Sequence, residues 1–265
     1  MNIEQWQHLT SGDLGEVDPE STIALLPVAA IEQHGPHLPL GTDALIGQGI
    51  IGALPREADP NPRLLVLPSL VLGHSLEHRA FPGTLTLEAE TLIATWVEIG
   101  RSVAEAGLRK LVIFNSHGGQ THLVDIVALR LRVQMDLLVA RCSYFAFGTP
   151  PGLFAEDELS QGLHGGEVET SLMLHLHPSL VRREHLQDFE GLPAHMARRN
   201  ELLGVESPVG IGWMSQDLNP AGVCGRAARA DAERGAQLLH YLADRLATLI
   251  VELAETPLET LRSSR

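Results

Sequence analysis

The stretch "TIALLPVAAIEQHGPHLPLGTD", residues 22–43, joins an apolar run to side chains that bind metal ions. Residues 22–30 lack an alternating polar face, which is typical of a strand buried on both sides in a parallel sheet. Glu32 and His34 follow two positions apart, so an extended backbone would project both to the same side. Asp43 comes after a Gly/Pro-rich turn that can fold back over them. The stretch therefore predicts a buried parallel strand with carboxylates and imidazoles at its carboxyl end.

Similar apolar runs recur along the chain, and segments with helical periodicity separate them. The other short runs are residues 64–67, 111–114 and 137–140. Apolar side chains repeat at intervals of three and four within residues 87–108, 121–134 and 228–255. The alternation predicts a three-layer α/β/α sandwich with a mostly parallel central sheet. Because no Ser/Gly-rich linker or charge run divides the sequence, we expect a single domain over residues 1–265.

The composition excludes several classes of partner. The chain has 33 acidic and 19 basic residues and a net charge of -14, which disfavours nucleic acid and anionic membranes and fits a neutral or cationic small molecule. No apolar run approaches the roughly 20 residues of a membrane-spanning helix. The N-terminus lacks the pattern of a signal peptide, and the two cysteines lie far apart. These features predict a soluble cytoplasmic protein that uses imidazole and carboxylate chemistry.

A second polar cluster follows the run "KLVIFN", where "NSHGGQ" places His117 on a strand-to-helix turn. Gly118 in that turn permits the backbone to approach a ligand closely. The ligand crevice of an open α/β sheet lies at the carboxyl ends of its strands. We therefore expect His117 to lie near Glu32 and His34.

A third cluster, "GLHGGEVETSLMLHLHP", holds His164, Glu167 and Glu169 ahead of an apolar helical run. If the helix begins near Gly166, Glu169 shares the face of Leu172, Met173 and Leu176, and Glu167 does not. A buried carboxylate is costly unless it is paired or binds a metal. Of the two glutamates, Glu169 is therefore predicted to be the ligand.

Together the clusters supply three carboxylates and two imidazoles, from Glu32, His34, Asp43, His117 and Glu169. Such a set suits two divalent ions roughly 3.5 to 4 Å apart, which activate water for hydrolysis. The ligand types permit zinc, manganese or iron. An alternative interpretation is that the histidines are solvated or cap turns, and that the glutamate pairs with an arginine.

Three further segments have two interpretations each. The stretch "GHSLEHRAFPGTLTL", residues 73–87, offers Ser75, Glu77 and His78 as a wall of a substrate pocket, or it is a polar turn. Residues 148–166 and 206–225 are long, Gly/Pro-rich loops, which in compact domains are usually functional or disordered.

Four separated motifs, "LLPVAAIEQHGPHLPLGTD", "HRAFPGTLTL", "FNSHGGQ" and "HGGEVETSLML", resemble the creatininase (creatinine amidohydrolase) family in content and order. The resemblance spans most of residues 20–255. It implies a creatininase-type α/β/α fold, a dinuclear metal centre, hydrolysis of a C–N amide bond in a small substrate, and often a hexamer.

The resemblance also implies roles for individual residues. Glu32 and His117 would hold one metal, His34 and Glu169 the other, and Asp43 would bridge both. A metal-bound hydroxide would attack the amide carbonyl, and His164 would contact substrate and deliver a proton to the departing nitrogen.

The chain departs from the pattern of true creatininases at three positions. Gly119 stands where they carry a glutamate, and Ser160 and Phe145 stand where tryptophans are expected. The motifs look closer to the broader family, which includes a peptidase-like branch that trims the mycofactocin precursor and a deformylase branch. Because the deformylase and a dinuclear phosphoesterase need basic residues for phosphate, both are disfavoured. A catalytically silent metal- or ligand-binding protein on the same fold is the remaining alternative.

Overall fold

A five-stranded parallel sheet forms the centre of the molecule in a computed structural model, which describes residues 1–56, 61–206 and 209–262. The strands are β1 (Asn2–Gln5), β2 (Thr22–Val28), β3 (Arg63–Val66), β4 (Lys110–Asn115) and β5 (Leu138–Ser143). Their order is β1-β3-β2-β4-β5, and each neighbouring pair is parallel. Val28 pairs with Asn115, so β2 and β4 end side by side.

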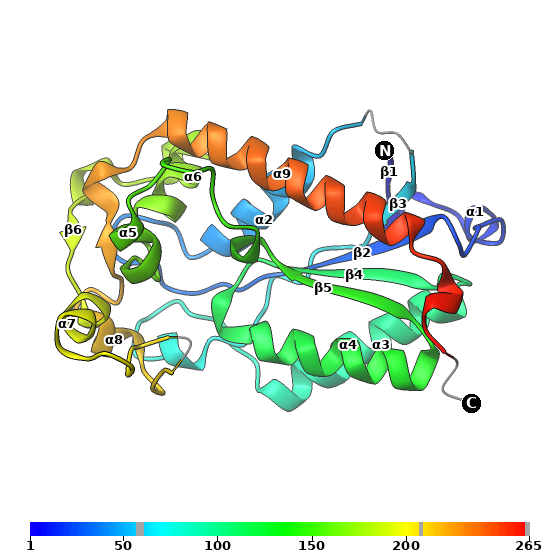
Figure 1. Cartoon of the computed structure of the whole chain (residues 1–265), viewed down its shortest axis with the longest axis horizontal. Helices are drawn as coiled ribbons and strands as arrows, with labels where there is room; N and C mark the ends of the chain where they lie inside the picture. Colours follow the sequence, from blue (N-terminus) through cyan, green and yellow to red (C-terminus); the bar gives the residue numbers. More distant parts are fainter. Residues whose placement is uncertain (57–60, 207–208, 263–265) are drawn as a thin grey trace.

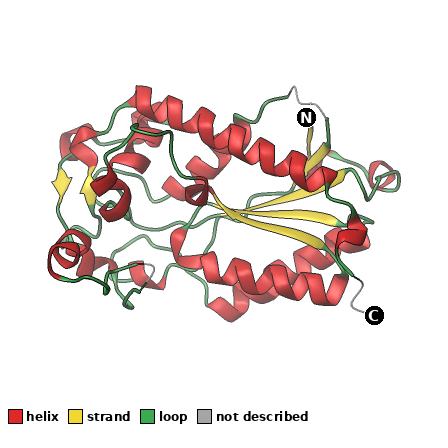
Figure 2. Cartoon of the chain, viewed as in Figure 1, coloured by secondary structure: helices red, strands yellow, loops and turns green. Residues whose placement is uncertain are grey.

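Helices cover both faces of this sheet (Figures 1 and 2). One face carries α2 (Thr42–Gly52), α6 (Glu167–Leu176) and α9 (Ala232–Glu255), and the other carries α3 (Ala89–Glu105) and α4 (Thr121–Met135). The predicted three-layer sandwich with a mostly parallel sheet is confirmed.

Strand β2 is one continuous apolar run because both of its faces are covered, as its sequence predicts. All seven residues of the strand are buried. Ile23 and Leu25 pack into the core beneath α2, α6 and α9, whereas Ala24 and Leu26 pack beneath α3 and α4. Because successive side chains of a strand point to opposite faces, a strand covered on both sides needs apolar residues at every position.

The predicted helices agree with α3, α4 and α9, and Gly107 adopts a φ of +94° directly after α3, as a glycine at a helix end does. Neither the edge strand β1 nor helix α2 was predicted from the sequence. The remaining elements are α1 (Ser11–Leu14), α5 (Glu156–Gln161), α7 (Leu192–Arg199), α8 (Ser215–Leu218) and the antiparallel pair β6 (Asp188–Phe189) and β7 (Gly225–Arg226). Within the two long loops lie the short helices α5 and α8; residues 207–208 of the second loop lie outside the described residues.

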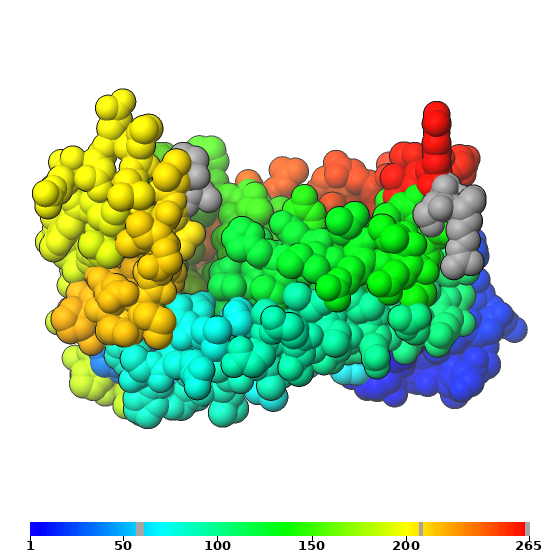
Figure 3. All heavy atoms as spheres, turned by 90° about the horizontal axis from the view of Figure 1, so that it is seen from below, coloured from blue at the N-terminus to red at the C-terminus, as the bar shows by residue number. Residues whose placement is uncertain are grey.

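The connections around β2 and β4 create the position for a site. β2 leads to α2 on one face of the sheet, and the adjacent β4 leads to α4 on the other face. Where neighbouring strands send their connections to opposite faces, a crevice opens at their carboxyl ends. In the space-filling view the surface is hollowed between the yellow segment near residue 200 and the green and cyan segments (Figure 3). Among the described residues, no helix is long and apolar enough to cross a membrane.

Candidate metal centre

The three polar clusters of the sequence meet at the carboxyl ends of β2 and β4. Glu32 and His34 follow β2, and His117 follows β4. Asp43 lies in the first turn of α2 and Glu169 in the first turn of α6. The five residues predicted as metal ligands are therefore brought together from four separate segments.

Asp43 lies at the middle of the cluster. Its Oδ1 atom is 3.2 Å from Nε2 of His34, and its Oδ2 atom is 3.1 Å from Nδ1 of His117. Nε2 of His34 is also 3.9 Å from Oε1 of Glu169. One carboxylate thus faces two imidazoles at once, as a bridging ligand would.

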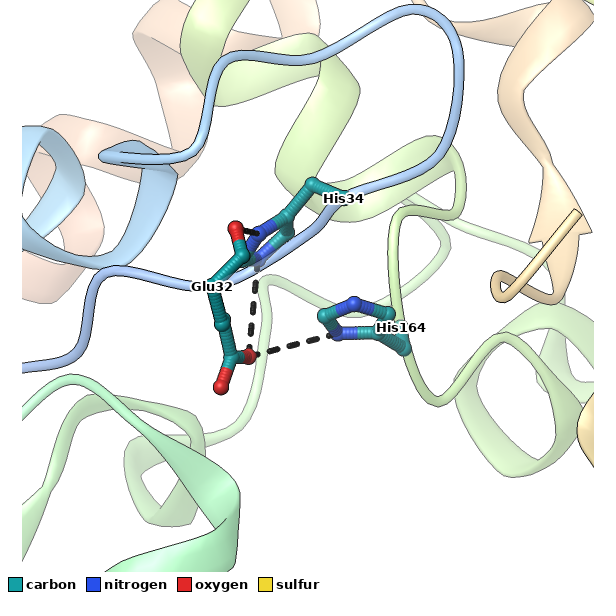
Figure 4. Close-up of side chains that lie close together, drawn as sticks. All are labelled: Glu32, His34 and His164. Atoms are coloured by element: carbon teal, nitrogen blue, oxygen red, sulfur yellow. Dashed lines mark hydrogen bonds and ion pairs between the residues drawn. The ribbon is translucent and has the colours of Figure 1, made fainter. Parts of the chain in front are cut away.

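Glu32 faces the same nitrogen of His117 as Asp43 does and contacts two further histidines. Its Oε2 atom is 3.3 Å from Nδ1 of His117, and its Oε1 atom is 3.3 Å from Nε2 of His78 and 3.8 Å from Nδ1 of His164. Figure 4 shows Glu32 and His34 on one loop, facing His164 on another. The side chain of Glu32 is 1% exposed, so its charge is kept from water.

Among the residues that the structure describes, four groups of three side chains have ligand atoms within 4.8 Å of one another. Two of them share Asp43, and all four contain either Glu32 or His34. The groups are Glu32–Asp43–His117, His34–Asp43–Glu169, Glu32–His34–His164 and Glu32–Glu77–His78. The first two are the ligand sets that the family resemblance implies for two ions.

Three histidines are oriented as metal ligands usually are. In each, one ring nitrogen lies against a backbone carbonyl: Nδ1 of His34 is 3.1 Å from the Glu32 oxygen, Nε2 of His117 is 2.9 Å from the His74 oxygen, and Nε2 of His164 is 2.8 Å from the Gln33 oxygen. A carbonyl oxygen can only accept, so these nitrogens carry the protons. The opposite nitrogen of each ring faces the cluster, which is the arrangement that outer hydrogen bonds impose on metal-ligating histidines.

Several buried polar atoms of the cluster have no hydrogen-bond partner within the described part of the chain. They are Oε2 of Glu32, Nε2 of His34 and Oδ2 of Asp43. Buried polar groups are rarely left unsatisfied, and a bound ion is one reason for such exceptions. The residues therefore fit a divalent cation at this position.

The electrostatics are those of a dense group of anions and imidazoles. Burial alone would lower the pKa of His34, but the carboxylates of Asp43, Glu169 and Glu32 raise that pKa to about 9. Burial likewise opposes protonation of His117, and Glu32 and Asp43 hold its pKa well above the ordinary range. In contrast, burial and the neighbouring histidines lower the pKa of His164 well below 6.5. The imidazoles of His34 and His117 are thus favoured in the protonated, positively charged form, whereas His164 is favoured in the neutral form.

The two glutamates of the third cluster have different surroundings, although both lie in the first turn of α6. Glu169 reaches His34 and Asp43, and its Oε2 accepts a hydrogen bond of 2.6 Å from the Gly165 N–H. Glu167 is the more deeply buried of the two, but it pairs with Arg234 and not with the cluster. The prediction that Glu169 and not Glu167 turns toward the cluster agrees with this geometry.

The predicted substrate-binding residues Ser75, His78 and Gly118 differ in how deeply they are buried. Ser75 is buried, with Oγ 3.3 Å from Nε2 of His117, and His78 is buried beside Glu32. Gly118 is exposed, and a Cβ there would meet nothing within 4 Å. Ser160 and Phe145 are also exposed.

Residues that support the cluster were not singled out from the sequence. Gln33 is buried, and its amide nitrogen lies 2.8 Å from Nδ1 of His78 and donates to the Gly222 carbonyl. His37 is buried, with Nε2 2.9 Å from the Gly165 carbonyl, and so joins the first motif to the third. The dense polar composition of residues 32–43 was the available signal, but the partners lie far away in the sequence, from 45 positions for Gln33 and His78 to 189 for Gln33 and Gly222.

Comparison with known proteins places these features in one family. The family model described as "Creatininase: Creatinine amidohydrolase" matches residues 7–250. The chain is 32% identical to the mycofactocin precursor peptide peptidase of Mycobacterium ulcerans, over 83% of this chain and 81% of that protein. It is 32% identical to the creatinine amidohydrolase of Pseudomonas putida, over 63% of this chain and 68% of that protein. Among solved structures, a mutant creatininase of Zn-Zn type matches with a TM-score of 0.76 and 26% identity, over 95% of this chain and 98% of its own.

Proposed function

The chain belongs to the creatininase family and is a hydrolase that acts on C–N bonds, and from this premise we propose that it hydrolyses a small amide at a dinuclear metal centre. Glu32 and His117 would hold one divalent ion, and His34 and Glu169 the other. Asp43 would bridge the two. Zinc, manganese and iron all suit these ligands.

The position of Asp43 is the observation that supports this proposal most strongly. Its two oxygens face His34 and His117 at 3.2 and 3.1 Å, and it is common to two of the metal-capable groups. A single ion would need only one of these groups. Two groups that share one carboxylate suit two ions at the short separation of dinuclear hydrolases.

When bound, two such ions lower the pKa of water to about 7 and stabilise negative charge on a carbonyl oxygen. The protein's own contribution is to orient and protonate. His164 is neutral, and its Nε2–H is held by the Gln33 carbonyl, so Nδ1 is free to accept a proton and pass it to the departing nitrogen. Glu169, whose side chain is 16% exposed, lies at the more open side of the cluster, where a substrate would enter. Ser75, His78 and Gly118 are proposed to line the same pocket.

The substrate class follows from the same residues. A cyclic amide or a related small molecule without a phosphate fits a cluster of carboxylates and imidazoles, because none of the ion pairs of Glu32, Asp43 and Glu169 found in the described residues involves Lys or Arg. Creatinine itself is disfavoured by Ser160 and Phe145, which stand where the family places tryptophans.

A second candidate is a peptidase of the mycofactocin-precursor type. The Mycobacterium ulcerans peptidase aligns over 83% of this chain, against 63% for the Pseudomonas putida amidohydrolase at the same identity. A short peptide would present its amide to the same groups, so the geometry of the cluster serves both substrates.

We also propose a cytoplasmic homo-oligomer, with a hexamer as the form to test, built from one domain over residues 1–265. The family resemblance supports the oligomer, and the sequence composition supports the cytoplasmic location. Size-exclusion chromatography with light scattering measures the assembly directly.

The test of function is a hydrolysis panel with the metal-loaded protein. It contains creatinine, other cyclic amides, formamides and short peptides, each assayed before and after removal of metal by a chelator. We expect turnover of at least one amide that disappears with the metal and returns on readdition of Zn²⁺ or Mn²⁺. Bound metal with no turnover of any member would favour the catalytically silent binding protein instead.

A further inference from the structure

Glu77 occupies the space beside Gly119. A Cβ atom at position 119 would lie 1.9 Å from Oε1 of Glu77 and 2.7 Å from Nε2 of His117. Real Cβ atoms do not approach other atoms so closely. A side chain at position 119 would therefore displace the Glu77 carboxylate from its present position, which Gly119 leaves open.

The Glu77 carboxylate faces the imidazoles of the metal centre. Oε1 is 3.5 Å from Nε2 of His117 and 3.8 Å from Nε2 of His78. It also lies within 4.8 Å of ligand atoms of Glu32 and His78, in one of the metal-capable groups. Glu77 therefore lies next to His117 and His78, the two imidazoles that also face Glu32.

The backbone holds Glu77 in this place. It lies in the short 3-10 helix Leu76–His78, and its carbonyl accepts a hydrogen bond of 2.7 Å from Oγ of Ser215. The same hydroxyl lies 2.7 Å from Nδ1 of His78. Ser215 from α8 therefore fixes the segment that carries Glu77, although the two residues lie far apart in the sequence.

The charged groups around the Glu77 carboxylate are imidazoles and other carboxylates of the cluster. In the described part of the chain, the ion-pair partners of Glu77 are His78 and His117, with no Lys or Arg among them. Its side chain is only 16% exposed. Four carboxylates, from Glu32, Asp43, Glu77 and Glu169, thus gather in the described part of the chain without a Lys or Arg partner, and the two proposed divalent cations would supply the matching positive charge.

We propose that Glu77 is a positioning residue of the metal centre, which holds His117 and His78 in place and strengthens cation binding from the site that Gly119 leaves open. The inference rests on the proposed metal centre and adds a residue to it. It also gives a physical meaning to the glycine at 119, where true creatininases resemble one another in a glutamate: this chain brings its carboxylate from position 77 instead.

The test measures binding of Zn²⁺ to metal-free protein by competition with a chromophoric chelator. Glu77→Gln keeps the shape of the side chain and removes its charge, and we expect Zn²⁺ affinity to fall about 10- to 100-fold, the usual effect of losing an outer-shell partner. Gly119→Ala should have an effect in the same direction because its Cβ displaces Glu77. The matched control is Gly52→Ala at the exposed far end of α2, whose Cβ meets nothing within 4 Å and which should leave Zn²⁺ affinity unchanged.

The double variant separates this role from simple crowding. If position 119 acts through Glu77, adding Gly119→Ala to Glu77→Ala should change Zn²⁺ affinity by no more than about twofold, whereas independent effects would multiply. Thermal unfolding of each metal-free variant measures its melting temperature. A purely structural role of Glu77 would lower this temperature, whereas the proposed role would leave it unchanged.

The outcomes are distinct. Wild-type protein that binds no Zn²⁺ would contradict the proposed metal centre itself. Wild-type protein that binds Zn²⁺ while Glu77→Gln binds it equally tightly would overturn only the role of Glu77. Multiplying effects in the double variant would also overturn it.

Discussion

Oδ1 of Asp43 lies 3.2 Å from Nε2 of His34, although the loop 35–41 separates the two residues and Asp43 belongs to helix α2. The other oxygen of Asp43 is 3.1 Å from His117, which follows a different strand. The two ends of this one carboxylate therefore connect the segments after β2 and β4. This relationship makes Asp43 the residue on which both proposed metal positions depend.

Asp43→Asn should remove metal from both positions. The amide keeps the size of the side chain but loses the charge that two cations would share. We expect metal content to fall from two ions per chain toward none, and affinity to fall by more than the 10- to 100-fold typical of an outer-shell partner. Elemental analysis of the purified variant measures this. Retention of two tightly bound ions would show that Asp43 does not bridge.

Glu169→Gln and Glu167→Gln form a matched pair of substitutions in one turn of α6. Glu169→Gln should weaken metal binding and amide hydrolysis, because Glu169 faces His34 and Asp43. Glu167→Gln should leave metal content unchanged but lower the free energy of unfolding, because Glu167 pairs with Arg234. Since Arg234 is partly exposed, we expect a loss below the roughly 3–5 kcal/mol that breaking a fully buried pair costs.

Metal titration and chemical denaturation of both variants check this pair. If Glu167→Gln lost metal while Glu169→Gln kept it, the assignment of Glu169 as the ligand would be reversed.

His164→Asn should lower the turnover number while the metal stays bound. The proposed proton transfer through Nδ1 contributes about 100- to 10,000-fold, so kcat should fall by that range. Substrate affinity is expected to change less. Kinetics at saturating metal, with metal content measured on the same sample, tests the role. If His164→Asn instead loses a metal ion, then His164 is a ligand and not the proton carrier.

The metal-free protein should lose stability as pH rises, and in the same range should bind metal more tightly. The folded-state pKa of His34 is about 9, above its ordinary value of 6.5. Protonation of His34 therefore favours the folded state: this contribution is complete below about pH 6.5 and is lost as pH rises through about 9. Because the proton must leave before a metal binds, Zn²⁺ affinity should rise over the same interval.

Denaturation of the metal-free protein and Zn²⁺ titration from pH 6.5 to 9 give both curves. His34→Asn isolates the contribution of this residue, since its curves should be flatter than those of the wild type. Parallel curves for the two proteins would contradict the assigned pKa.

The sequence predicts the sandwich because its long elements carry strong patterns. β2 is apolar at every position, and α9 repeats Leu238, Leu242 and Leu246 on a buried face. Strand β1, "NIEQ", has no such pattern because it lies at the sheet edge and is only partly buried. Helix α2 is buried along much of its length and holds three glycines, so it shows little polar periodicity.

Most residues of the cluster could be predicted to lie together because they stand at the end of an element with a recognisable pattern; Asp43, in the unpredicted helix α2, was placed by the Gly/Pro-rich turn before it. Glu32 and His34 follow an apolar strand, and Glu169 shares the inward face of an amphipathic helix. Glu77 has no comparable local signal. Its relation to Gly119 arises only when two segments more than 40 positions apart meet in space, and a single sequence does not record that contact.

The metal content of purified, untagged protein tests the central claim most directly. Elemental analysis should find two divalent ions per chain, and metal-free protein should take up two equivalents of Zn²⁺ or Mn²⁺ on titration. Protein that neither carries nor takes up a stoichiometric divalent ion would contradict the account of the site.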